Sequence, residues 1–167
     1  MTTALRLLVA MLAAALCGGC AYRLGPASTM NVRSIAVPNF HNTTYQPRIS
    51  VQVTDAVISR LQTDGAIRVV SEEAADATLT GEITNWRREP MLYRSDNTLV
   101  AKEYMLYVHA HVILTDNRTG KRLIEGEFVG RTKYFFGNDM TQSERQAFPL
   151  AADDLARRIT DRIVDAW

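Results

Sequence analysis

The chain has 167 residues, of which 47% are hydrophobic and 22% are charged, and its formal net charge is +1. This length predicts one domain, and the composition is too apolar and too balanced in charge for a disordered chain. A net charge near zero excludes a protein that binds nucleic acid over its whole surface. The only two cysteines, Cys17 and Cys20, lie near the N-terminus, which excludes a disulfide framework and a paired Cys-x-x-Cys zinc site.

An export signal opens the chain. Residues 7–16 form a ten-residue apolar run that follows Arg6, the first charged residue. A membrane-spanning helix needs about 20 apolar residues, so this run is too short to span a bilayer. Its length and its preceding positive charge are typical of the hydrophobic part of a secretory signal peptide.

The end of the signal resembles a bacterial lipobox, in which a cysteine is acylated and becomes the mature N-terminus. Gly18 and Gly19 supply the small residues that precede Cys20. We expect residues 1–19 to be the signal peptide and Cys20 to be lipidated. Cys17 is the poorer candidate because it follows a bulky leucine, and it occupies the position where lipoboxes prefer leucine. The alternative is an ordinary signal peptide that leaves Cys20 as a free thiol.

The segment after the cysteine indicates where the protein is held. Ala21 stands where an aspartate would signal retention in the inner membrane, so the outer membrane is expected. Residues 20–31 form a tether of twelve residues, which reaches at most about 40 Å. We therefore expect a single domain, residues 32–167, that works close to its membrane.

The first half of this domain predicts a strand, a helix and a strand. Residues 32–37 form an apolar strand that ends at Pro38, and residues 39–47 are a polar connection. Residues 48–64 have apolar side chains every four residues, which predicts a helix, and residues 66–70 form the next strand. The apolar face of the helix is formed by Ile49, Val53, Val57 and Leu61.

Three longer strands follow. Residues 77–84 and 103–115 alternate apolar and polar side chains, the pattern of a sheet with one buried and one solvated face. Residues 116–120 predict a hairpin turn in which Gly120 takes positive φ, and residues 123–134 return as the next strand. The last predicted element is a helix whose apolar face is formed by Phe148, Ala152, Leu155, Ile159 and Ile163.

Pro149 is expected to interrupt this last helix, with the regular helix beginning there and a kinked or separate turn before it. The predicted order is β-α-β-β-β-β-α, or one with fewer strands if a short strand does not pair. Each helix has a single apolar face, so both can cover the same face of the sheet. The predicted fold is α+β, a mixed four- to five-stranded sheet with two helices packed on one face.

Neither metal binding nor catalysis is expected. His109 and His111 share one face of a strand and could chelate a metal, but a solvated strand explains them better because the third histidine, His41, is distant in sequence. The chain has no Gly-x-Ser-x-Gly elbow and no phosphate-binding glycine loop. No cofactor is predicted, and an enzyme is the least supported class.

The carboxylates near the C-terminus predict ion pairs on the surface of a helix. Asp153, Asp154 and Asp161 lie close together in the sequence. Arg158 follows Asp154 by four residues, and Asp161 follows Arg157 by four, which is the spacing of ion pairs on a solvated helix face.

A basic segment, residues 87–102, is predicted as the loop between two of the long strands. It contains Arg87, Arg88, Arg94 and Lys102, with Met91, Leu92 and Tyr93 among them. Arginine binds phosphate in a bidentate manner, and the apolar residues can contact acyl chains or a protein wall. The alternative interpretation is an ordinary basic loop.

Four segments together resemble the LptE family of lipopolysaccharide-assembly lipoproteins. They are residues 92–94, 102–108 and 134–138, and the lipobox start at residues 20–24. The resemblance implies two helices on a mixed sheet, a position as a plug inside the LptD β-barrel, help in assembling that barrel, and lipopolysaccharide binding at the outer membrane. It makes Arg94 the first candidate for a lipopolysaccharide contact, with Arg87 and Arg88 beside it.

A second resemblance provides an alternative function. Residues 35–44, the following helix and residues 67–70 are similar to the opening of lipoproteins that activate peptidoglycan synthases and of the curli-secretion lipoprotein. The synthase activators usually carry a long linker across the periplasm, which the short tether here does not provide. The curli pore needs membrane-inserting hairpins, which this sequence does not show.

Overall fold

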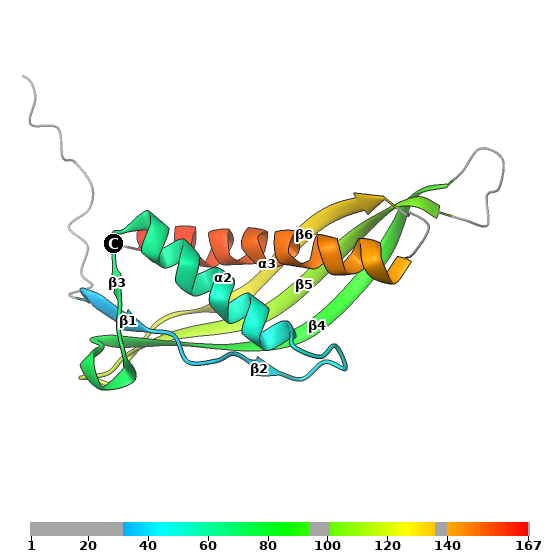
Figure 1. Ribbon diagram of the computed structural model, residues 1–167. Coiled ribbons are helices and arrows are strands. Elements are labelled where there is room, and N and C mark those ends of the chain that lie inside the picture. The colour runs from blue at the N-terminus through cyan, green and yellow to red at the C-terminus, as the bar shows by residue number, and fades with distance from the viewer. Residues whose placement is uncertain (1–31, 94–100, 136–139, 167) are drawn as a thin grey trace, which may run out of the picture.

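The computed structural model describes residues 32–93, 101–135 and 140–166 (Figure 1). The signal peptide, Cys20 and Arg94 lie outside the described residues. The elements in chain order are β1 (Ser34–Ala36), β2 (His41–Asn42), α2 (Ile49–Asp64), β3 (Arg68–Val69), the 3-10 turn η1 (Glu72–Ala74), β4 (Ala77–Tyr93), β5 (Ala101–Asp116), β6 (Arg122–Phe135) and α3 (Met140–Asp165).

The strands form one mixed sheet in the order β3-β1-β4-β5-β6, with β2 added beside β4. The short strands pair in parallel, and the long hairpins β4–β5 and β5–β6 are antiparallel. Both helices lie over the same face of this sheet (Figure 1). The predicted α+β class is confirmed. The sheet has six strands instead of the predicted four to five. The additional strand is the two-residue β2, which lies in the segment predicted as a polar connection.

The core lies between the helices and the covered face of the sheet. Alternate residues of β5 are buried, as their period of two predicts, and they are Leu106, Val108, Ala110, Val112 and Leu114. The predicted apolar faces of both helices are buried in the same core. Phe40 fills the space above Gly81, where an added Cβ would overlap its ring. Neither described helix covers the opposite face of the sheet, and its side chains are partly exposed (Figure 1).

The helices differ from prediction at two points. Arg48 precedes α2 with a left-handed backbone (φ 61°), and Gly65 ends the helix as expected (φ 74°). The prediction that the regular helix begins at Pro149 after a separate turn is wrong, since α3 extends from Met140 to Asp165 with Pro149 inside it. Pro149 is exposed, so water can satisfy the backbone carbonyl that loses its hydrogen bond. Neither described helix is both long and apolar enough to cross a membrane.

The prediction of a loop over residues 87–102 is also wrong at its start. Strand β4 continues to Tyr93, so Arg87 and Arg88 lie in the sheet. A register shift between Ile83 and Asn85 breaks the alternating pattern that marks the first part of this strand. Beyond Ile83, β4 pairs only with β5 in the described structure, so Pro90 removes no second ladder of hydrogen bonds.

Candidate functional site

The candidate site is the far end of the three long strands. We call this region the strand tip and define it as residues 87–93 of β4, 101–107 of β5 and 131–135 of β6. Antiparallel pairing brings these segments together, with Arg87 opposite Tyr107 and Tyr107 opposite Arg131. The strand ends rise beside the beginning of α3, at the end of the molecule remote from the C-terminus (Figure 1).

Arg87 and Arg88 lie on opposite faces of β4, because successive side chains of a strand alternate. On the open face, the Arg87 guanidinium lies 5.0 Å from the centre of the Tyr107 ring and 3.2 Å from Glu89. On the helix side, Arg88 donates a hydrogen bond to Glu144 of α3 over 3.0 Å. The structure therefore separates two side chains that were predicted to act together in one loop.

The Arg88–Glu144 pair fixes α3 to the strand tip. It lies beside Tyr134, whose ring stacks on Tyr104 with 5.7 Å between centroids. Burial raises the pKa of the Tyr134 phenol, so this side chain stays neutral. The tip is thus supported from the helix side by an ion pair and two stacked tyrosines.

Large apolar side chains of the strand tip are open to solvent. The exposed fractions are 49% for Met91, 52% for Leu92 and 66% for Phe135. Met91 and Leu92 were predicted as part of the basic segment, whereas Phe135 comes from β6. An exposed apolar cluster on a charged background is typical of a surface that binds a lipid or another protein.

Charged side chains of both signs lie among these apolar residues, and Glu103 of β5 is the register partner of both Leu92 and Phe135. Lys133 of β6 forms an ion pair over 3.0 Å with Glu103 of the neighbouring strand β5. Lys102 is exposed and has no ion-pair partner within residues 32–93, 101–135 and 140–166. The sequence-based reasoning missed Lys133 and Phe135, because only the pairing of β6 with β5 places them at the tip.

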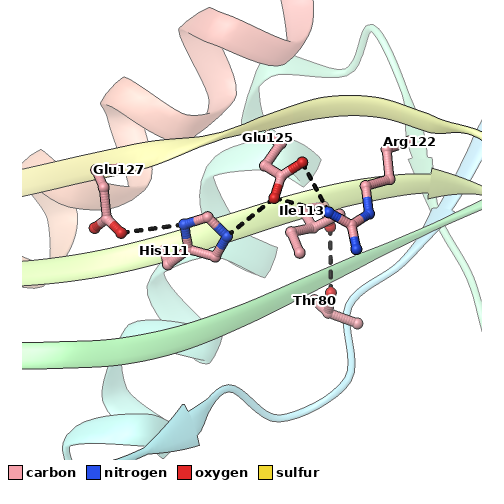
Figure 2. Close-up of polar contacts among 6 residues, drawn as sticks. All are labelled: Thr80, His111, Ile113, Arg122, Glu125 and Glu127. Carbon is pink, nitrogen blue, oxygen red and sulfur yellow. Dashed lines mark hydrogen bonds and ion pairs between the residues drawn. The ribbon is translucent and has the colours of Figure 1, made fainter.

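His109 and His111 lie on the open face of the sheet, as predicted. His111 lies between two glutamates of β6, with its Nδ1 at 3.1 Å from Glu127 and its Nε2 at 3.5 Å from Glu125 (Figure 2). Arg122 also binds Glu125, and its hydrogen bond is the main cause that lowers the pKa of that carboxyl. In the described parts of the chain, no group of three or more His, Cys, Asp or Glu could hold a metal ion.

The predicted ion pairs of the last helix are present. Asp154 binds Arg158 over 2.9 Å, and Arg157 lies 3.8 Å from Asp161. Asp154 also binds Arg157 and accepts a hydrogen bond from the backbone N–H of Arg131 on β6. This carboxylate therefore joins the helix to the outer strand of the sheet, a role in structure rather than in chemistry.

Comparison with known proteins gives a family. A family model described as LptE, lipopolysaccharide-assembly, matches residues 32–166. A search of curated proteins found no match to the sequence.

Solved structures of low sequence identity share the fold. Protein CT253 from Chlamydia trachomatis superposes with a TM-score of 0.55 at 12% identity, covering 78% of this chain and 94% of that one. Protein XCC0632 from Xanthomonas campestris gives 0.53 at 13% identity, covering 84% and 86%. A minor lipoprotein from Acinetobacter baumannii gives 0.51 at 15% identity, covering 78% and 91%.

Proposed function

The chain belongs to the LptE family of lipopolysaccharide-assembly proteins, and from this membership we propose that it is an outer-membrane lipoprotein of the lipopolysaccharide translocon. In this role the domain plugs an LptD-like β-barrel, helps that barrel to assemble, and binds lipopolysaccharide. The match over residues 32–166 supports this role over activation of a peptidoglycan synthase or curli-type secretion. The proposed role is binding and assembly without chemical turnover.

The strand tip is the proposed lipopolysaccharide site. The observation that carries this assignment is that Leu92 and Phe135 are exposed on the strand tip that also carries Arg87 and Lys133. Lipopolysaccharide combines acyl chains with phosphates on sugars, so it needs apolar and cationic groups on one surface. Guanidinium groups bind phosphate in a bidentate manner, and exposed apolar side chains can pack against acyl chains.

The bases of the tip act locally, because the whole chain is nearly neutral. Arg87 is paired with Glu89, and Lys133 is paired with Glu103. A phosphate that binds either base must displace its carboxylate partner or join the pair. The Arg87–Glu89 pair is exposed on both sides and therefore weak, so exchanging its partner costs little, whereas the Glu103 side chain of the other pair is only 14% exposed. Arg94 remains a proposed contact, next in the chain to the end of β4, and Arg88 supports the site from its pair with Glu144.

We also propose lipid anchoring through Cys20 after removal of residues 1–19. A single acyl chain holds a protein only marginally on a membrane, whereas the three chains of a mature bacterial lipoprotein hold it stably. The short tether then keeps the domain beside the inner surface of the outer membrane, where a barrel can take it up.

Binding of purified lipopolysaccharide tests the site. Leu92→Asp and Phe135→Asp place a charge where acyl chains would pack, and we expect each to weaken binding by roughly tenfold. Arg94→Glu should weaken binding as well. Leu150→Asp is the matched control, because this side chain is also more than half exposed and lies on α3 away from the tip. Equal affinity of the native chain and the Leu92, Phe135 and Arg94 variants would exclude the strand tip as the site.

A further inference from the structure

We propose that the loop between β2 and α2 carries a second site, for an anionic saccharide, and that its ligand is the sugar region of lipopolysaccharide. The inference about the ligand's source rests on the proposed function. Two hollows meet at Gln46 in this loop, with volumes of about 400 Å³ and about 540 Å³. Both volumes are within the range of small-ligand pockets.

The smaller hollow has the chemistry of a sugar site. Its lining contains two aromatic residues, the fully exposed Tyr45 and the partly buried Trp86, together with Gln46, Thr84 and Asn85, and no charged residue. The C–H face of a pyranose packs against aromatic rings, and its hydroxyls exchange hydrogen bonds with amide and hydroxyl groups. Trp86 Nε1 is buried without a hydrogen-bond partner in the described structure, so the protein leaves this donor unused.

The loop is already fixed in shape. The Asn42 side-chain oxygen accepts hydrogen bonds from the backbone N–H and the hydroxyl of Thr44, and its amide donates to the Gln46 carbonyl over 2.9 Å. Thr43 holds the loop to β4 through a 2.8 Å hydrogen bond to the Ile83 carbonyl. A preformed loop loses little conformational freedom when a ligand binds, which favours binding.

The larger hollow is suited to an anion. Arg48 and Arg145 line it, and neither has an ion-pair partner in the described parts of the chain. The carboxylate in its wall, Glu144, is already paired with Arg88. Arg48 also holds a left-handed backbone at φ 61°, an unfavourable conformation for a residue other than glycine. Strain of this kind is frequent at binding sites.

Together the two hollows favour one ligand, a sugar that carries a phosphate or carboxylate. Gln46 lines both hollows, so they are neighbours on this loop, and the proposed ligand places its ring in the smaller one and its acidic group toward the larger one. Glu144 belongs to the wall of the larger hollow and binds Arg88 of the strand tip. The larger hollow is therefore linked to the helix side of the strand tip through the Arg88–Glu144 pair.

Trp86 allows the site to be tested directly. The chain has two tryptophans, so Trp167→Phe leaves Trp86 as the only one. The probe is the phosphorylated oligosaccharide obtained by removing the acyl chains from lipopolysaccharide. We expect a saturable change in Trp86 fluorescence, and affinities lowered roughly tenfold by Tyr45→Ala, Asn85→Ala and Arg145→Ala. Lys121→Ala and Arg162→Ala are the controls, because both side chains are exposed and neither lines the two hollows.

Each other outcome would overturn a defined part of the inference. Binding of intact lipopolysaccharide without binding of the oligosaccharide would remove this site and leave the proposed function standing. Binding of neither would remove both. Inorganic phosphate that binds as tightly as the oligosaccharide would exclude the sugar part. Tighter binding of a peptidoglycan disaccharide would exclude lipopolysaccharide as the source. If the Tyr45, Asn85 and Arg145 variants bind the oligosaccharide as tightly as the protein without these substitutions, the two hollows are excluded as its binding site.

Discussion

Gly130 on β6 lies directly against the carbonyl oxygen of Ala151 on α3, with no room for a side chain between them. One residue further along β6, the backbone N–H of Arg131 donates a hydrogen bond to Asp154 on the same helix over 3.0 Å. The outer edge of the sheet is thus joined to α3 by close backbone packing and by a carboxylate. An edge strand covered in this way is less open to pairing with another chain.

Gly130→Ala should destabilise the fold. An added Cβ would overlap the Ala151 carbonyl oxygen and the Leu155 side chain, so α3 must move away from β6. We expect a loss of about 2–3 kcal/mol in the free energy of unfolding, measured with urea. Gly126→Ala, on the same strand, is the control, because its Cβ would meet only Phe128 at 3.6 Å. Equal stability of the two variants would refute the close packing of β6 and α3.

Asp154→Asn should destabilise the protein at neutral pH by about 1 kcal/mol, because a charged acceptor of several hydrogen bonds is lost. Burial raises the pKa of the Asp154 carboxyl, but hydrogen bonds from Arg158, Arg157 and the Arg131 backbone outweigh it, so the pKa lies below its ordinary value. The carboxylate therefore stabilises the fold above the unfolded-state pKa of about 3.9, and this contribution is lost as the pH falls through the lower folded-state pKa.

Thermal unfolding of the native chain and the Asp154→Asn variant between pH 7 and pH 3 checks this prediction. The difference in stability should shrink at the acidic end. Asp153→Asn is the matched control, because Asp153 is exposed and is the adjacent residue in α3. A stability difference that is constant over the whole pH range would contradict the assigned role of Asp154.

Arg48→Gly should stabilise the fold while weakening the proposed saccharide site. The backbone of Arg48 is left-handed, with φ at 61°, and glycine adopts this conformation without steric cost. We expect a gain of about 1 kcal/mol in the free energy of unfolding. Arg60→Gly, inside α2, should instead lose about 1 kcal/mol, because glycine disfavours a helix interior. A loss of stability in both variants would argue against backbone strain at Arg48.

The fold was predictable where a regular pattern reports burial on one face. The period of two in β5 and the four-residue spacing in α2 each gave the correct buried face, and Gly120 takes the expected positive φ at 69°. Pattern alone could not extend β4 to Tyr93. A register shift follows Ile83, and Arg88 and Pro90 then take positions on the covered face, where apolar residues would be expected.

The candidate site was predictable only in part. The sequence predicts Arg87, Met91 and Leu92 as candidate site residues, because they lie close together in the chain. Lys133 and Phe135 join them only through strand pairing, more than 40 positions later in the sequence. The hollows around Gln46 depend on a loop held by Asn42 and on the approach of α3, which no local pattern indicates.

Cys20→Ser should release the protein from the membrane. Serine has no thiol to acylate, so the proposed anchor cannot form, and the protein should appear in the soluble periplasmic fraction. Cys17→Ser is the matched control and should leave anchoring intact, because Cys17 is expected to leave with the signal peptide. Fractionation with labelled fatty acid checks both variants. Acylation of the Cys20→Ser variant, or loss of acylation only in Cys17→Ser, would overturn the assignment.

Purification of the full-length protein from outer membranes tests the central claim, that this chain is a component of the lipopolysaccharide translocon, most directly. Mild detergent extraction followed by identification of co-purifying proteins is the measurement. We predict recovery of a large LptD-like β-barrel together with lipopolysaccharide. Recovery of a peptidoglycan synthase in place of a barrel would contradict the account.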